Sequence, residues 1–210
     1  MSEQTATLAA VDRSSRREQN KAENRAALLK AARTVFAEMG FGAAAVRDIV
    51  RRTDLASGTF YNYFKDKEEI FNAVIAELTV ELLRRHRDGR SKATTAEEFF
   101  RRHCSVYLRF VAEDPEILAF GRNNVTPIRS LFDKPDLQGL ADALNDDIRT
   151  AIARGVLPDV DVPYLMAALS GIVFEVSVVM TSRDPVDPDV ATEFATRLLM
   201  GGIDKLPKRR

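Results

Sequence analysis

A chain of 210 residues is long enough for one large domain or for two smaller ones. Apolar residues make up 45% of it and charged residues 30%, a composition that excludes an intrinsically disordered chain. The single cysteine, Cys104, excludes an intrachain disulfide and a multi-cysteine zinc site and favours a cytoplasmic location. The 31 basic and 31 acidic residues cancel, but from Arg13 to Arg52 there are ten Lys or Arg and four Asp or Glu. This local balance of +6 indicates a polyanion contact near the N-terminus.

Neither a targeting segment nor a membrane span is expected. The first residues, Met1 to Val11, lack the basic start and the apolar core of a signal peptide. The longest nearly uncharged run, Val162 to Thr181, contains Glu175, which a membrane span would rarely carry. We therefore interpret this run as a buried helix and expect no membrane partner.

The N-terminal third predicts a disordered arm followed by three helices. Residues 1–15 have no apolar stripe and are assigned to the arm. From Leu28 to Met39 apolar residues recur at i, i+3, i+4, i+7, i+8 and i+11, and Gly40 follows where a left-handed helix cap belongs. Two short helices then flank a tight turn, and the predicted ranges are 46–50, 53–55 for the turn, and about 57–64.

The remainder also predicts helices only, so the fold class is all-α. Asp66 is placed to cap a long helix that ends near Gly89, and residues 125–135 are expected to form a loop or a single turn. The other predicted helices are 95–113 with Thr95 as its cap, 115–123, 137–155, 162–182 and 188–202. We expect a helix-turn-helix domain over residues 16–66 and a helical bundle over residues 67–210.

The second short helix carries residues suited to a DNA groove. In a helix-turn-helix unit the second helix is presented to the major groove. Ser57 and Thr59 are short hydrogen-bonding side chains, and Gly58 permits close approach of the backbone to another surface. Tyr61 and Asn62 can reach phosphates or base edges.

At these residues the chain resembles TetR-type repressors. The resemblance covers about residues 22–72 and is most specific at Gly58-Thr59-Phe60-Tyr61-Asn62-Tyr63-Phe64 followed by Lys67-Glu68. Leu28-Leu29-x-Ala-Ala-x-x-x-Phe36 and Gly40-Phe41 match the first helix of that family. The chain departs from the family pattern at Ala45, where Thr is usual, at Thr53-Asp54, where Ala-Gly is usual, and at Val50, which replaces a small Ala.

The resemblance implies a role for each matching residue. Thr59, Tyr61 and Lys67 would contact phosphate, and Arg47 would touch backbone or a base edge. Ser57, Gly58 and Asn62 would face the bases. Tyr63 is assigned to the DNA face or to packing, and Phe64 to packing.

The resemblance also implies that the second half binds a small molecule and forms a homodimer through helices 162–182 and 188–202. Independent support comes from residues 164–180, which are apolar around nearly the whole helix, and from the small residues Ala167, Ala168, Ser170 and Gly171. The alternative is a central core helix in a monomer. Candidate ligand contacts are polar groups and neighbouring aromatic side chains in the second half, namely Phe99, His103, Tyr107, Phe120, Arg122, Asn123, Asn124 and Glu175.

Glu175 is interpreted as a buried carboxylate that needs a partner, because an unpaired buried charge is costly. Arg122, a side chain of the second subunit and the ligand are three possible partners.

These observations predict a homodimeric transcriptional regulator, a repressor that binds a palindromic operator in double-stranded DNA and is released by a small, largely apolar effector. One alternative is a helical adaptor that binds a protein without DNA. The other is an enzyme using Cys104 and His103, but adjacent helical residues point about 100° apart and cannot form the needed hydrogen bond locally. No catalytic residue, cofactor or metal is expected.

Overall fold

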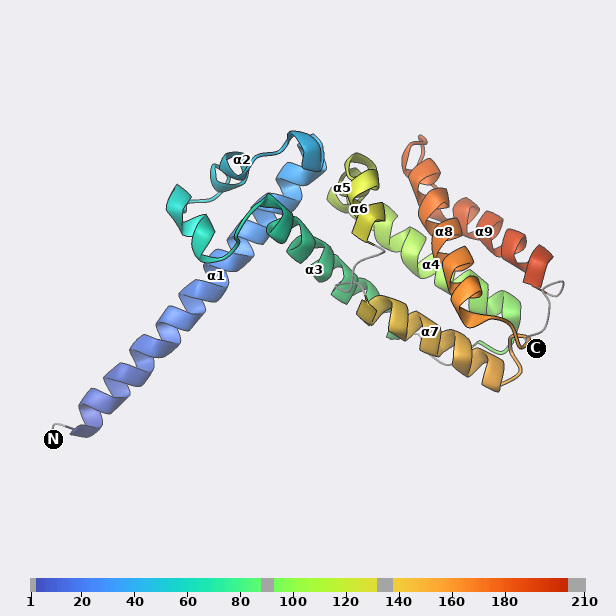
Figure 1. The fold of residues 1–210 in the computed structure, drawn as a ribbon, viewed down its shortest axis with the longest axis horizontal. Helices are drawn as coiled ribbons and strands as arrows, with labels where there is room; N and C mark the ends of the chain where they lie inside the picture. Colours follow the sequence, from blue (N-terminus) through green and yellow to red (C-terminus); the bar gives the residue numbers. More distant parts are fainter. Residues whose placement is uncertain (1–2, 88–92, 132–137, 204–210) are drawn as a thin grey trace.

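The computed structural model describes residues 3–87, 93–131 and 138–203, with side chains from residue 16 onward except at 138–141. These ranges contain helices and no strand, which confirms the all-α expectation (Figure 1). The elements are α1 (Glu3–Ala43), α2 (Val46–Val50), η1 (Ser57–Asn62, a 3₁₀ helix), α3 (Lys67–Arg87), α4 (Ala96–Glu113), α5 (Pro115–Asn123), α6 (Val125–Leu131), α7 (Gln138–Ala153), α8 (Val162–Thr181) and α9 (Pro188–Ile203).

The N-terminal unit closes around one aromatic core. The predicted stripe of α1 is buried from Leu28 to Phe36, but Met39 at its end is 45% exposed. At the next residue, Gly40, the backbone has φ 73° and kinks the helix. Phe36, Phe60 and Phe71 bring α1, η1 and α3 together.

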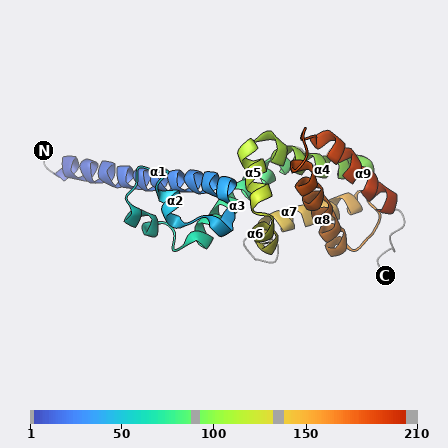
Figure 2. The ribbon, with the colours of Figure 1, turned by 90° about the horizontal axis from the view of Figure 1, so that it is seen from above.

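The predicted arm differs from the structure, because α1 already begins at Glu3. Its N-terminal part projects away from the rest of the molecule (Figures 1 and 2). Residues 3–15 contain no Gly or Pro and include Ala6, Ala9 and Ala10, so helix propensity is high although no apolar stripe exists. The absence of an apolar stripe therefore does not imply the absence of a helix.

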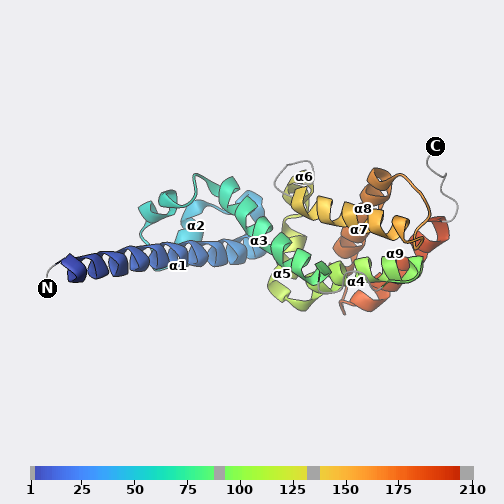
Figure 3. The same ribbon diagram turned by 90° about the horizontal axis from the view of Figure 1, so that it is seen from below.

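The C-terminal unit packs α4, α7, α8 and α9 around a second core, and α3 links it to the first (Figure 3). Ile70, Phe71 and Val74 at the start of α3 belong to the N-terminal core, whereas Leu82 further along belongs to the C-terminal unit. Capping residues begin several helices as predicted: Glu69 N donates to Asp66, and Glu98 N donates to Thr95.

The expectation of a loop or a single turn is wrong for residues 125–131, because Val125–Leu131 forms the helix α6, and residues 132–135 lie outside the described residues. Pro127 lies in the first turn of α6, where a missing N–H costs no helical hydrogen bond. Ile128 and Leu131 pack against the N-terminal core, and this burial of apolar side chains stabilises the helical conformation.

Candidate functional sites

The turn between α2 and η1 is held by one side chain. Thr53 Oγ1 donates to Val50 O at 2.9 Å and accepts from Leu55 N at 3.3 Å. Val50 and Phe60, both buried, join the N-terminal core from the two sides of this turn. Ala45 offers no capping oxygen, and Asp48 replaces part of that role because its Oδ2 accepts from Ala45 N at 3.0 Å.

Five of the eight predicted DNA contacts are exposed on α2 and η1. Tyr61 is 64% exposed, with its ring edge against Phe60. Thr59 of η1 is half-buried. The exposed residues form one candidate surface, which we call the η1 face: Arg47, Ser57, Gly58, Tyr61 and Asn62.

The polar atoms of Tyr63 and Lys67 are engaged within the protein. The Tyr63 hydroxyl accepts from Asn24 Nδ2 at 3.2 Å, and its ring packs against the N-terminal core. Lys67 Nζ donates to Phe41 O at 2.6 Å and to Ala44 O at 2.8 Å and lies 4.4 Å from the centre of the Phe41 ring. Lys67 therefore ties the end of α1 to the start of α3, a role that a phosphate contact alone would not require.

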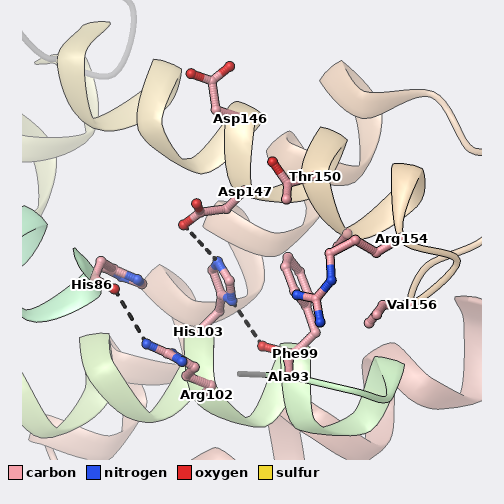
Figure 4. A pocket seen from close by; sticks show the side chains of 11 residues that line it. His86, Ala93, Phe99, Arg102, His103, Asp146, Asp147, Thr150, Arg154 and Val156 are labelled. Carbon is pink, nitrogen blue, oxygen red and sulfur yellow. Dashed lines mark hydrogen bonds and ion pairs between the residues drawn. The ribbon is translucent and has the colours of Figure 1, made fainter. Parts of the chain in front are cut away.

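The C-terminal unit contains a cavity of about 240 Å³ between α3, α4 and α7, and an apolar extension of about 60 Å³ toward α8 (Figure 4). His86 and His103 line both parts. Of the predicted ligand contacts, Phe99 and His103 line the larger part, and His103 and Tyr107 line the extension. The cavity also contains residues that sequence reasoning missed, which come from α4, from α7 and from the turn after α7: Arg102, Asp147, Thr150 and Arg154.

The other predicted ligand contacts lie elsewhere. Phe120 is 1% exposed and stacks on Phe71 in the N-terminal core. Arg122 is exposed at the end of α5, and the neighbouring Asn123 Nδ2 donates to Ala37 O at 2.6 Å. Asn124 is fully buried at the junction of the two units. The predicted polar cluster of residues 122–124 is therefore not part of the cavity.

The expectation that Glu175 is buried is wrong, and its partner in the structure, Arg129, is none of the three partners considered from the sequence. The side chain of Glu175 is 57% exposed and forms an ion pair with Arg129 of α6. The apolar composition of α8 suggested burial on all sides, but Glu175 lies on the face of α8 that points away from the protein's own core. It lines a separate open groove between α8 and α9.

Cys104 is inaccessible in the C-terminal core. It is 0% exposed, and burial raises the pKa of its thiol to about 12, although a hydrogen bond with Thr196 opposes the shift. Since the thiolate is the reactive form, we expect no reaction of native protein with a disulfide-exchange reagent at neutral pH. Urea-unfolded protein should react with one equivalent of a chromogenic disulfide reagent, which is measured by the absorbance of the released thiol. Rapid stoichiometric labelling of the native protein would contradict the burial of Cys104.

Known proteins are similar to this chain at two levels, namely the sequence of the N-terminal unit and the fold of most of the chain. Residues 28–74 fit the family model described as bacterial regulatory proteins, tetR family. The HTH-type transcriptional repressor KstR2 of Mycolicibacterium smegmatis is 35% identical over 77 residues. That match spans 37% of this chain and 38% of the length of the relative.

The whole fold has solved counterparts. A TetR-family transcriptional regulator from Pectobacterium atrosepticum is 26% identical, with a TM-score of 0.65 over 91% of this chain and 98% of its own. The regulator FadR from Bacillus subtilis, in complex with stearoyl-CoA, is 24% identical, with a TM-score of 0.72 over 84% of this chain and 98% of its own. Residues 28–74 thus carry the N-terminal domain of the tetR family of bacterial regulatory proteins, and the described residues share the fold of solved TetR-family regulators.

Proposed function

We propose that this protein is a homodimeric transcriptional repressor that binds a palindromic operator and is released by a small, largely apolar effector. The observation that carries the proposal is the η1 face, where residues able to contact phosphates and bases are exposed on a helix-turn-helix unit. The basic balance of residues 13–52 supplies attraction for the DNA backbone. Such a protein works in the cytoplasm, where it reaches DNA.

The two units divide the work in this proposal. Residues 16–66 bind DNA, and residues 67–210 bind the effector and a second subunit. The cavity lined by His103 is the effector site, because it is mostly apolar with a few convergent polar groups. Only Asp114 separates α4, a cavity wall, from α5, which packs on α1. A shift of α4 on effector binding would therefore reach the η1 face through α5 and α1.

The second subunit is proposed to cover an apolar surface of α8 and α9, which we call the α8–α9 face. Val190, Phe194 and Leu198 recur every four residues on α9, each more than half exposed. On α8, Tyr164 and Val179 are exposed together with the small residues Ala167, Ala168 and Gly171. Small residues permit close approach of helices, and an exposed apolar stripe of this extent is typical of an interface.

Replacing Tyr61 with alanine is expected to weaken DNA binding at all sequences by about 1–2 kcal/mol per subunit, because the lost contact is to phosphate. Tyr61→Phe should reproduce most of this loss if the hydroxyl makes the contact. Fluorescence anisotropy on an operator selected from genomic fragments, repeated over a range of salt concentrations, measures both variants. Asn62→Ala should instead change which half-site is preferred.

Absence of any salt-dependent shift with a pooled genomic library at low salt would overturn the DNA-binding proposal and favour the adaptor.

A further inference from the structure

Three basic side chains form a row on the N-terminal part of α1. Arg17, Lys21 and Arg25 recur every four residues, so they lie on one side of the helix, and all three are exposed. The row is about 12 Å long, because an α-helix rises about 1.5 Å per residue. Arg25 Nη1 lies 3.9 Å from Glu77 Oε1, and among the described residues no carboxylate pairs with Arg17 or Lys21. We call the three basic residues the α1 stripe.

The α1 stripe continues the side of α1 that packs into the N-terminal core. Lys21 precedes Leu28 by seven residues, which is about two helical turns, and Leu28 is fully buried in that core. On one side of the helix, therefore, apolar side chains give way to basic ones where α1 extends past the core (Figures 1 and 2). Of the acidic residues in this segment, Glu18 lies at the edge of the stripe, and Glu23 lies on the opposite side, where it accepts from Gln19 Nε2 at 3.0 Å. The stripe thus presents a net positive charge to solvent.

Contacts at its inner end place the α1 stripe beside η1. Arg25 Cζ lies 5.4 Å from the centre of the Phe64 ring, and Asn24 Nδ2 donates to the Tyr63 hydroxyl at 3.2 Å. Tyr63 and Phe64 directly follow η1, so this part of α1 adjoins the end of the helix that carries most of the η1 face. The rest of the stripe lies further out, on the projecting part of α1 (Figure 1). The stripe is therefore placed to meet a long polyanion that extends beyond the η1 face.

We propose that the α1 stripe is a second DNA contact, made to phosphates of the operator beyond those that the η1 face reaches. The proposal rests on the proposed DNA-binding function. Double-stranded DNA carries one negative charge per about 1.7 Å of its axis, so a basic row about 12 Å long faces several phosphates. Contacts to phosphate carry no sequence information, so the stripe adds affinity without changing the preferred half-site. Residues 16–27 contain no apolar side chain larger than that of alanine, which disfavours insertion of this segment into a lipid surface.

The matched pair Lys21→Gln and Lys30→Gln tests the proposal. Both variants remove one positive charge from an exposed position on α1, but the two positions are nine residues apart and lie about 180° apart around the helix. Fluorescence anisotropy of the full-length protein on an operator selected from genomic fragments, at about 50 to 200 mM salt, gives the slope of log K against log salt concentration. We expect Lys21→Gln to reduce the magnitude of this slope by about 0.9 for each subunit and Lys30→Gln to leave it unchanged.

The double variant Arg17→Gln/Lys21→Gln should reduce the slope by about 1.8 for each subunit. Because the lost contacts are to phosphate, its affinity for an unrelated DNA fragment should fall by the same factor as its affinity for the operator. Its melting temperature should match that of the wild type, since both side chains are exposed.

A wild-type slope in the double variant would overturn the proposal and leave DNA binding by the η1 face standing. Equal changes for Lys21→Gln and Lys30→Gln would also overturn it, because they would indicate a general effect of net charge. Cosedimentation with anionic phospholipid vesicles that Lys21→Gln abolishes, together with an unchanged slope on DNA, would assign the stripe to a membrane surface instead. Wild-type protein that binds no DNA would overturn the proposed function itself.

Discussion

Asn124→Leu is expected to lower the free energy of unfolding by about 2–4 kcal/mol. Asn124 is 0% exposed, and its Nδ2 donates to Phe36 O and to Phe120 O, each at 2.8 Å. Its Oδ1 accepts from Phe41 N at 2.6 Å, just beyond the kink at Gly40. Leucine has a similar volume but leaves the Phe41 N–H without this partner. Urea unfolding followed by circular dichroism measures the change.

Asn123→Ala is the matched control. Asn123 makes one hydrogen bond, to Ala37 O, at the rim of the same junction. We expect a loss of about 1 kcal/mol, the net contribution of a single hydrogen bond. Equal losses for the two variants would show that the three bonds of Asn124 do not hold the junction.

The same junction should transmit the effector signal. Glu116 at the start of α5 pairs with Arg33 of α1, so α5 is attached to α1 near both of its ends. The backbones of α1 and α5 are also in close contact at Gly40, because a Cβ at this position would lie 2.8 Å from Asn123 O. We therefore expect Asn124→Leu protein, assayed where it is folded, to bind operator without effector but to respond less to it.

Most helices could be predicted from local sequence signals, whereas the cavity in the C-terminal unit could be predicted only in part. Thr95 and Asp66 mark the starts of helices in the sequence. A helix cap requires only a side-chain oxygen that accepts from a backbone N–H in the first turn, so it is a local signal. Four of the five residues of the η1 face lie in the contiguous segment Ser57–Asn62, so a sequence motif is enough to find most of it. Asp147 approaches His103 only because the tertiary fold places α7 across the cavity from α4, and no spacing in the sequence encodes that approach.

Two errors share a physical cause. Asn124 and Glu175 were assigned to a ligand site because a polar residue among apolar ones needs a partner. The partners exist, but they are distant in sequence: backbone atoms of α1 for Asn124, and Arg129 for Glu175. The apolar circumference of α8 predicts contacts on more than one side. In the subunit one side packs on the core, and the exposed residues of α8 indicate which side a second subunit would cover.

Phe194→Asp is expected to raise the dissociation constant of the dimer by about 30-fold or more and to weaken operator binding with it. Phe194 is 60% exposed and lines the groove of about 730 Å³ between α8 and α9. An aromatic side chain at the centre of an interface contributes about 2 kcal/mol or more, and a buried unpaired carboxylate adds to the loss. Operator affinity falls because a palindrome requires two linked subunits. Sedimentation velocity over a concentration series measures the dimer.

Val80→Asp is the matched control, because Val80 on α3 is 66% exposed and lies outside the α8–α9 face. Both variants should keep the melting temperature of a folded subunit, since neither side chain is in a core. Aspartate at Val173 or Met180 of α8 would not distinguish loss of the dimer from loss of the fold. These residues are 9% and 3% exposed, and a charge there unfolds the subunit itself. A Phe194→Asp protein that sediments like wild type would show that a different surface joins the subunits, or that the protein acts as a monomer.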